Sequence, residues 1–543
     1  MLTDDYEEFT ETQRRILERY VTNTHGHVFA LRNLPEVIKG ALFSRYSRSS
    51  LGIRSLLLKE FIGNNEETHF SEIAGSNDGS NNAQIQQDAI QKAQNFYDRI
   101  LDGYGDDSIG ELGGAHLAAE NISMLAAKAI EDCRIGGSPL EKSTRYVYFD
   151  QKVNGEYQFY RDPILMTSAF RDVYTDTCNH LFETYSRLIP LLSEIFEKEM
   201  PKDPAISAAA YRAALRAKVL DCLRGLLPAS TLTNVGVFGN GRFYEGLLHK
   251  LHCHNLTEIQ EIGKRSCDEL AKIIPSFVRR AHAEHRTHTS YSSFFENMNN
   301  ELTQVSAMFS GGADRSFANG VRLIEYDPDS PAKVAAALLF PFCNRGLSDL
   351  RRQCKHLSEE DISRILDAAA LSREHRRHKS PRALEHAAFT FEVVGDYGAY
   401  RDLHRHRLLT QEKQLLTCDY GFHLPPELEG TAMEDDYNNA MFRAKETYDL
   451  IAAELPEEAQ YVVPMGYHIR WYIHANLRAL QWLCELRSAA AGHPSYRHIA
   501  QEIARQVCHV IPAFERFFKF VDFEGYEIGR LGQEQRKIEK QKI

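Results

Sequence analysis

Three consecutive cationic side chains, Arg405, His406 and Arg407, follow an apolar, strand-like run in the last third of the chain. Arginine carries a fixed planar charge whose fork of N–H donors fits phosphate oxygens, so clustered Arg and His residues favour a phosphorylated ligand. A solvated charged face is the alternative interpretation of such a string. Glu385 and His386, at the start of the apolar run, add another cationic donor and favour a binding site.

A second cluster lies in the first half of the chain, where Glu141, Ser143 and Arg145 alternate and Tyr146 follows. Side chains of a strand repeat every two residues, so an extended segment would place this carboxylate, hydroxyl and guanidinium on one face. Such a face suits a phosphate group or the edge of a base. An ordinary surface strand is the alternative.

Together, the two clusters resemble the two halves of the signature of flavin-dependent thymidylate synthases, the thymidylate synthase complementing protein family. In that family, Arg-His-Arg is followed at a short, fixed distance by Glu-x-Ser-x-Arg-Tyr. Here the two parts are separated. No Glu-x-Ser-x-Arg-Tyr follows Arg407, and only Arg134 of the Arg-His-Arg string precedes Glu141, with about one residue of extra spacing. The resemblance covers roughly residues 100–260 and 320–500.

Other family positions divide between the halves in a complementary way. The family's substrate-side arginine is Arg224 in the first half, whereas the second half has Gln460. The arginine that contacts the pyrimidine is Arg487 in the second half, whereas the first half has Leu251. A histidine, His386, precedes the motif in the second half, whereas Leu112 stands at the corresponding position of the first half. Random decay would not be expected to sort losses in this way.

An internal repeat accompanies this division. Pro228 is followed twelve residues later by Asn-Gly-Arg at 240–242, and Pro464 is followed twelve residues later by Asn-Leu-Arg at 476–478. The Asn-x-Arg triplet is the flavin-side motif of the family. Two matches at one spacing, combined with the resemblance, predict a tandem duplication.

Family members are homotetramers whose active sites lie between subunits, so the resemblance implies a composite site built from the two halves. The implied reaction is reductive methylation of dUMP at C5, with methylenetetrahydrofolate as carbon donor and FAD reduced by NADPH. The implied catalytic residues are Ser143 and Arg487. The implied substrate-binding residues are Glu141, Ser143, Arg145, Arg224, Asp402, Arg405 and Arg487. The implied flavin-binding residues are His386, Arg405, His406, Arg407, Asn476 and Arg478.

Two positions depart from the family pattern. Asp402 stands where the family usually has Gln beside the uracil, and Trp482 stands where many members have a smaller polar residue near the flavin. Because a carboxylate only accepts hydrogen bonds, modification of another pyrimidine nucleotide is one alternative. The other alternative is a catalytically inactive nucleotide-binding or flavin-binding protein, since a split motif also fits lost activity.

Helical periodicity dominates the segments that must position these residues. It predicts helices within residues 11–21, 82–101, 172–200, 437–455 and 495–521, and strand-like runs at 145–151, 157–162, 321–327 and 387–394. We therefore predict a helix-rich α/β (α+β) fold of two tandem thymidylate synthase-like domains, each a small mixed sheet packed with long helices. Domain 1 is expected at residues 1–280, a polar linker at 281–320 and domain 2 at 321–543.

Composition limits the partners of this 543-residue chain. The net charge of −11 disfavours a nucleic-acid-binding surface, and no apolar run reaches the roughly 20 residues of a membrane span. The ten cysteines form no Cys-x-x-Cys pair, which suits free thiols in a reducing cytoplasm. Histidines at 249–254 and 282–288 favour polar surfaces over a metal site, so no metal is predicted. The resemblance implies a homodimer of tandem chains that forms a pseudo-tetramer.

Overall fold

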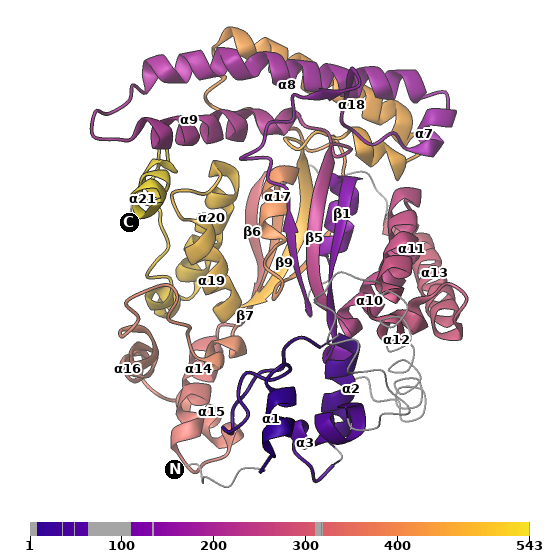
Figure 1. Cartoon of the computed structure of the whole chain (residues 1–543). Coiled ribbons are helices and arrows are strands. Elements are labelled where there is room, and N and C mark those ends of the chain that lie inside the picture. The colour runs from indigo at the N-terminus through magenta and orange to yellow at the C-terminus, as the bar shows by residue number, and fades with distance from the viewer. Residues whose placement is uncertain are drawn as a thin grey trace. The chain divides into compact units, whose positions relative to one another are not determined.

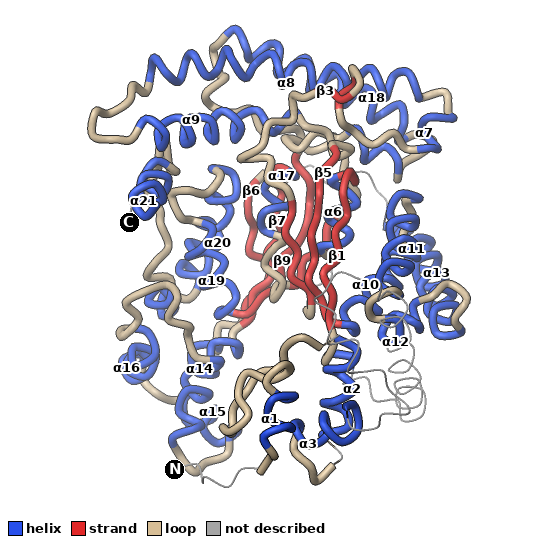
Figure 2. Tube along the Cα trace, viewed as in Figure 1, coloured by secondary structure: helices blue, strands red, loops and turns tan. Residues whose placement is uncertain are grey.

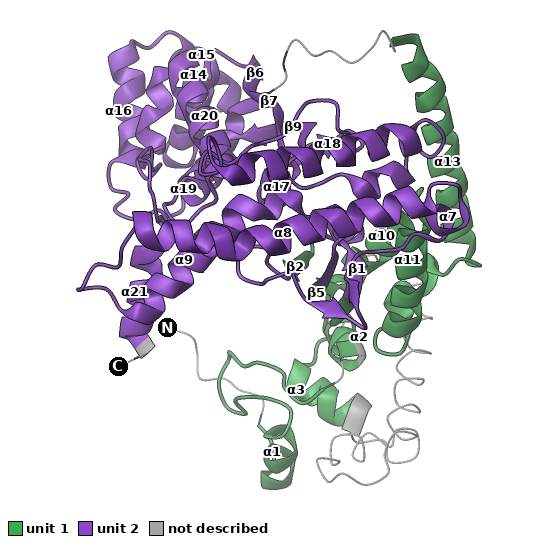
Figure 3. Cartoon of the chain, turned by 90° about the horizontal axis from the view of Figure 1, so that it is seen from above, with its two compact units in different colours: residues 1–119, 133–140, 235–310 green, residues 120–132, 141–234, 311–543 purple. Residues whose placement is uncertain are grey.

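The chain divides into two compact units, which Figure 3 shows in different colours. The computed structural model describes residues 8–34, 36–47, 49–62, 110–132, 135–309, 317 and 319–541. Unit 1 comprises residues 1–119, 133–140 and 235–310, and unit 2 comprises residues 120–132, 141–234 and 311–543. Unit 2 thus gathers residues from both halves of the sequence. The boundaries at 280 and 321 stay a prediction, and the predicted helix at 82–101 and Arg134 lie outside the described residues.

Unit 1 is mainly helical in its described part. Its α-helices are α1 (Glu11–Leu17), α2 (Glu36–Tyr46), α3 (Ile53–Leu56), α10 (Gly241–His252), α11 (Thr257–Ala271), α12 (Pro275–Val278) and α13 (Arg286–Ser306). A π-helix, η1 (Leu57–Ile62), and a 3-10 helix, η4 (Arg279–Ala281), complete the unit, and a further 3-10 turn, η5 (Ala307–Phe309), follows α13. Residues 286–306, within the predicted linker, therefore form one continuous helix.

Unit 2 contains a four-stranded sheet that Figure 2 shows in red. Its strands lie in the order β6 (Gly320–Tyr326), β7 (Ala388–Asp396), β9 (His468–Asn476) and β8 (Thr410–Lys413). Alternate β-branched and aromatic side chains such as Phe389, Phe391 and Val393 are fully buried, which explains why this run forms a central strand. All three pairings are antiparallel, so the mixed sheet predicted here is wrong.

The first half of the sequence supplies a smaller sheet. Its order is β1 (Gly114–Ser123), β5 (Leu232–Asn240) and β2 (Gly137–Glu141), and a hairpin of β3 (Lys152–Val153) and β4 (Glu156–Tyr157) follows in the chain. The strand predicted at 145–151 is wrong, and the one predicted at 157–162 is reduced to its first residue. The chain turns at Ser143 instead, where the hydroxyl accepts a hydrogen bond from the Arg145 amide at 3.3 Å. Serine hydroxyls favour such local turns over strands.

Helices make up most of unit 2. They are α6 (Met124–Glu131), α7 (Pro163–Thr167), α8 (Arg171–Glu199), α9 (Ala208–Leu223), α14 (Ser330–Leu339), α15 (Leu347–Lys355), α16 (Glu359–Ala370), α17 (Tyr397–Leu403), α18 (Ala432–Ala452), α19 (Leu477–Arg487), α20 (Pro494–Val510) and α21 (Leu531–Gln541). Short 3-10 helices are η3 (Arg224–Leu226), η6 (Phe340–Phe342), η7 (Arg382–His386), η8 (Glu458–Val462) and η9 (Pro512–Phe517). The long helices α8 and α18, which the periodicity predicted, lie side by side (Figure 1).

The two halves meet in unit 2 with a repeat visible in the backbone. Pro228 and Pro464 form an isolated antiparallel bridge. The amide of Ala229 donates to the carbonyl of Val463, and the amide of Met465 donates to the carbonyl of Leu227, both at 2.9 Å. In each half, the residue after the proline donates to the residue before the proline of the other half. These bonds agree with the tandem duplication that the repeat predicted.

Candidate active site

Two short helices, one from each half, adjoin predicted site residues, since α17 carries Asp402 and α6 precedes the strand β2 that ends at Glu141. Helix α6 begins after Ser123 and helix α17 begins after Asp396, and each of these side chains accepts a hydrogen bond from an amide of the first turn, at 3.0 and 2.7 Å. Such a cap satisfies an N–H group that the helix itself leaves unpaired. The two helices touch, because Lys128 of α6 donates to the backbone oxygen of Arg401 of α17 at 3.3 Å.

Glu141, at the end of β2, is a buried carboxylate surrounded by cations from both halves. Its Oε1 accepts a hydrogen bond from Arg401, and its Oε2 lies 3.4 Å from Lys128 Nζ and 3.6 Å from Arg405 Nη2. Burial alone would raise the pKa of Glu141, but the three cations outweigh it and lower the pKa below its ordinary value. Lys128 also pairs with Glu131, and burial lowers the pKa of Lys128 to about 7.

Arg224 and Asp402 form the second buried pair of the site. Arg224 Nη1 donates to Asp402 Oδ2 at 3.1 Å, and its Nη2 has no hydrogen-bond acceptor among the described residues. Burial would raise the pKa of Asp402, but Arg224, Arg145 and Arg487 outweigh it and hold the pKa well below its usual range. Asp402 is therefore a charged residue set among guanidinium groups.

Arg145 is held by a carboxylate of its own half and a phenol of the other half. Its Nε and Nη2 donate to the two oxygens of Asp221 at 2.6 and 2.5 Å, in the bidentate arrangement that orients an arginine most strictly. Its Nη1 donates to the Tyr496 hydroxyl at 2.9 Å. These bonds use three of the five N–H groups of Arg145, which leaves donors for a ligand.

Tyr496 also contacts Arg487. The Arg487 Cζ lies 5.3 Å from the centre of the Tyr496 ring, and the Arg145 Cζ lies 5.6 Å from it. Arg487, the last residue of α19, donates from Nε to His406 Nε2 at 2.8 Å. Burial and the Arg487 charge lower the pKa of His406 to about 3, so this imidazole accepts the bond in its neutral form. Arginines from the two halves thus converge on one ring.

The remaining predicted substrate residue, Ser143, is half-buried at the turn between Glu141 and Arg145. The prediction that these three residues share one face of a strand is wrong, because the strand ends at Glu141. Glu141 and Arg145 are nevertheless both buried in the same unit, where they pair with Arg401 and Asp221.

Three of the residues predicted for the flavin, His386, Asn476 and Arg478, form a second group at the other end of α19. Asn476 caps this helix through a 2.9 Å bond from the Ala479 amide, and Arg478 pairs with Glu385 at 2.7 Å. His386 is exposed, with its Nδ1 3.1 Å from Arg351 Nη2. At a rise of 1.5 Å per residue, Arg478 and Arg487 are separated by roughly 14 Å along the helix. The two groups therefore lie at opposite ends of α19 in unit 2.

Arg405 and Arg407 complete the cationic string after α17. The Arg405 side chain is about one-third exposed at 35%, and Arg407 is exposed. Guanidinium groups that are open to solvent suit a cofactor that carries a diphosphate. The donor set of the second half therefore fits the flavin that the resemblance implies.

Among equivalent positions of the two halves, Gln460 differs from its counterpart in what its side chain can still bind. Gln460, the counterpart of Arg224, is buried with its amide nitrogen on the Glu457 side chain and backbone at 3.1 and 3.0 Å, and its Oε1 accepts from the Leu416 amide. It is an internal structural residue. By contrast, the ion pair of Arg478 recurs in unit 1, where Arg242 pairs with Glu111 at 2.8 Å.

Several residues that organise the site carry no motif in the sequence. Asp221 and Tyr496 hold Arg145, Arg401 and Lys128 hold Glu141, and Arg351 contacts His386. A signal for Arg401 and Lys128 does exist: each precedes the Arg-His-Arg position of its half, six residues before Arg407 and six before Arg134. Asp221 and Tyr496 have no comparable local signal.

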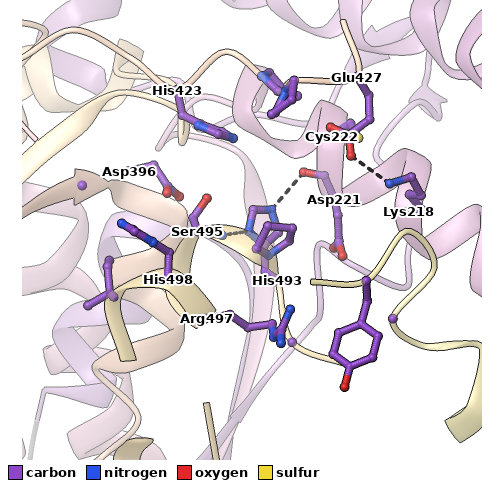
Figure 4. A pocket seen from close by; sticks show the side chains of 18 of the residues that line it. Lys218, Asp221, Cys222, Asp396, His423, Glu427, His493, Ser495, Arg497 and His498 are labelled. Atoms are coloured by element: carbon purple, nitrogen blue, oxygen red, sulfur yellow. Dashed lines mark hydrogen bonds and ion pairs between the residues drawn. The ribbon is translucent and has the colours of Figure 1, made fainter. Parts of the chain in front are cut away.

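A cavity of about 310 Å³ opens beside Asp221 (Figure 4). His493 lies at its wall, where Nε2 donates to the Asp221 backbone oxygen at 3.0 Å and Nδ1 accepts from the Ser495 amide at 3.2 Å. Burial and the nearby Arg224 lower the pKa of His493 to about 4, so it is neutral near pH 7. Lys218 and Glu427, which also line the cavity, form a 2.8 Å ion pair.

Among the described residues, no group of three or more His, Cys, Asp or Glu side chains is arranged to hold a metal ion. The His249 and His288 rings that the sequence singled out stack on each other, with nitrogens 2.8 Å apart. No helix in the described ranges combines the length and apolar character that a membrane crossing needs.

Comparison with known proteins gives matches over both halves. The profile of the thymidylate synthase complementing protein family matches residues 64–276 and 322–513. The chain is 54% identical over 530 residues to a UPF0159 protein of Chlamydia muridarum and 55% identical over 531 residues to one of Chlamydia pneumoniae, with 98% of each chain covered. A UPF0159 protein of Thermoplasma acidophilum is 33% identical over 525 residues, which cover 92% of this chain and 98% of the relative.

Proposed function

The chain belongs to the thymidylate synthase complementing protein family, and from this premise we propose that it methylates dUMP at C5 in a flavin-dependent reaction. Methylenetetrahydrofolate is the proposed carbon donor and NADPH the proposed reductant. The proposed site is composite, with residues from both halves of one chain. Each half alone lacks part of the family's set of site residues.

One observation carries this proposal. The residues that each half retains are the ones that meet: Arg145 of the first half and Arg487 of the second half lie against the same Tyr496 ring. Arg224 of the first half also pairs with Asp402 of the second. If the split motif recorded only decay, nothing would require the surviving residues to converge.

The charge balance of the cluster supports a phosphorylated substrate. Six cationic side chains, Lys128, Arg145, Arg224, Arg401, Arg405 and Arg487, accompany four carboxylates, Glu131, Glu141, Asp221 and Asp402. The excess amounts to two positive charges when Lys128 is protonated. A phosphate monoester carries about −1.5 to −2 charges at pH 7, so its binding would neutralise the cluster.

Each retained arginine has a role that its contacts support. Arg145, oriented by Asp221, and Arg224, whose Nη2 lacks an acceptor among the described residues, would bind the phosphate and sugar of dUMP together with Ser143. Arg487, held by neutral His406, would stabilise negative charge that develops on the pyrimidine ring. A guanidinium fixed before the reaction stabilises such charge without further reorganisation.

His386, Arg405, Arg407 and Arg478 would hold FAD, with Asn476 fixing the start of α19 and His406 fixing Arg487. The bound flavin would supply the redox chemistry of the reaction. The protein's own contribution is to orient the ligands and to provide fixed charge.

Modification of another pyrimidine nucleotide is a second candidate, and Asp402 is the observation that favours it. This carboxylate replaces the usual Gln, and Arg224 together with three neighbouring guanidinium groups keeps it charged. It therefore accepts hydrogen bonds and cannot donate one to a pyrimidine carbonyl oxygen. A base with an exocyclic amino group would suit it better than uracil.

Product analysis tests the proposal. Purified protein with FAD, NADPH and methylenetetrahydrofolate is expected to convert dUMP to dTMP, and the conversion should stop when any one component is omitted. Arg224→Gln, which places in the first half the residue that the second half has, should abolish most of the activity. No dTMP from flavin-loaded protein would contradict dUMP methylation, and the same assay with dCMP would then test the second candidate.

A further inference from the structure

A C-terminal segment that lies beyond the family match at residue 513 reaches the site region of unit 2. It is tied to α20, because Arg497 donates to the Glu524 backbone oxygen at 2.9 Å and Gln501 donates to the Asp522 backbone oxygen at 2.8 Å. Further along, the Gln535 side chain accepts from the Ser207 amide at the start of α9, at 3.1 Å. The segment is therefore fixed against helices of both halves.

Five consecutive residues of this segment, 526–530, line the 310 Å³ cavity, and Arg530 is the only cation among these five. It is 7% exposed, and its Cζ lies 4.2 Å from the centre of the Tyr146 ring. Its Nε and Nη1 have no hydrogen-bond acceptor in the described part of the chain. A buried guanidinium group without an acceptor is unfavourable, because its donors lose their bonds to water.

The other cations at the cavity wall are already paired. Lys218 pairs with Glu427 at 2.8 Å, and Arg497 donates to the backbone oxygens of Ser488 and Glu524 at 2.7 and 2.9 Å. Among the acids, Asp221 is occupied by Arg145. Within the described residues, Arg530 is thus the cavity-lining cation with vacant donors.

We propose that Arg530 binds the phosphate group of a nucleotide substrate, as a specificity residue supplied by the C-terminal segment; this inference rests on the proposed function. The planar fork of an arginine fits two phosphate oxygens at once. Tyr146, on which Arg530 stacks, adjoins Arg145, so the phosphate of dUMP is the source that the position favours. The 2′-phosphate of NADPH offers the same chemistry and is separated from dUMP by the test.

Calorimetric titration of the flavin-loaded protein tests the inference without requiring turnover. The ligands are dUMP, 2′-deoxyuridine, inorganic phosphate, NADPH and NADH, and the variants are Arg530→Gln and Arg530→Lys. The matched control is Arg536→Gln, an exposed arginine of α21. Arg530→Gln should raise the Kd of dUMP about 10-fold to 100-fold and leave that of 2′-deoxyuridine unchanged, because only a charge-assisted bond to the phosphate is lost.

Arg530→Lys should show a smaller increase in the dUMP Kd, and Arg536→Gln should show none. A selective loss of NADPH over NADH affinity would also support phosphate binding and would reassign its source.

The inference is overturned if Arg530→Gln binds every phosphorylated ligand within twofold of the native protein. It is equally overturned if both Arg530 variants lose thermal stability and weaken dUMP and 2′-deoxyuridine alike, since Arg530 would then be structural. Phosphate binding through Arg530 without dTMP formation would contradict the proposed function alone.

Discussion

The site residues form pairs, and the hydrogen-bonding groups that a partner leaves unused determine what each residue can bind. Arg145 keeps two N–H groups beyond those given to Asp221 and Tyr496, whereas the carboxylate of Asp402 is engaged by Arg224. Removing one member of such a buried pair leaves the other charge uncompensated, which commonly costs about 3 to 5 kcal/mol. Conservative variants are therefore more informative here than truncations.

His493 gives the site a defined response to acid. Burial lowers its pKa from the ordinary 6.5 to about 4, so between these pH values the unfolded chain binds more protons than the folded protein. The free energy of unfolding should therefore fall as the pH falls from 6.5 to 4, by about 3 kcal/mol from this group. Urea unfolding at pH 7, 6, 5 and 4.5 measures this slope. His493→Gln should flatten it, and equal slopes in both proteins would exclude the effect.

At the scale of elements, each half contains the same structural motif: a strand that ends in a capping residue and is followed by a short helix. Strands β5 and β9 end at Asn240 and Asn476, whose side chains accept bonds from the amides of Phe243 and Ala479 at 2.8 and 2.9 Å. Each half thus starts its helix in the same way. The helices differ at their ends, because α19 ends at Arg487 whereas α10 ends at His252.

This repetition provides a matched pair of variants. Asn476→Ala and Asn240→Ala should each lower the free energy of unfolding by about 1 kcal/mol, since each removes one helix cap. Only Asn476→Ala should also lower flavin content, which visible absorbance of the purified proteins reports. Equal flavin content in the two variants would contradict the assignment of the flavin to the second half.

Periodicity predicted long elements but not short turns. The helices α8 and α18 and the strands β6 and β7 were predicted because their apolar side chains recur at the spacing that the core requires. The segment after Glu141 has strand-like residues. The chain nevertheless turns at Ser143, and the Arg145 side chain pairs with the carboxylate of Asp221 on α9. A pairing that joins positions 76 residues apart leaves no periodic signal in the sequence.

The whole molecule places the two halves of a family signature in one 62.0 kDa chain. The Arg-His-Arg and Glu-x-Ser-x-Arg-Tyr parts were predictable from residue types and order. Their meeting point was not, since the Tyr496 hydroxyl that joins Arg145 to the second half lies 351 positions away in the sequence. Arg530 was not predictable either, because a single arginine near the C-terminus matches no motif.

A composite site within one chain predicts the behaviour of mixed subunits. Arg145→Ala and Arg487→Ala chains, co-expressed with different tags and purified together, should form no dTMP, because each chain then lacks one arginine of its own site. Native chains mixed with Arg145→Ala chains should keep about half of the activity and serve as the control. Restored activity in the doubly defective mixture would show that the site forms between chains.

The most direct test of the account is release of tritium from 5-tritiated dUMP by the flavin-loaded protein with NADPH and methylenetetrahydrofolate. The native protein should release tritium, and Arg487→Ala should release it about 100-fold to 1,000-fold more slowly, because one preorganised charge-stabilising group commonly contributes about 3 to 4 kcal/mol. Arg265→Ala, which changes an exposed arginine of α11, is the control and should act like the native protein. Near-native release by Arg487→Ala, or no release by the native protein, would contradict a composite thymidylate synthase site.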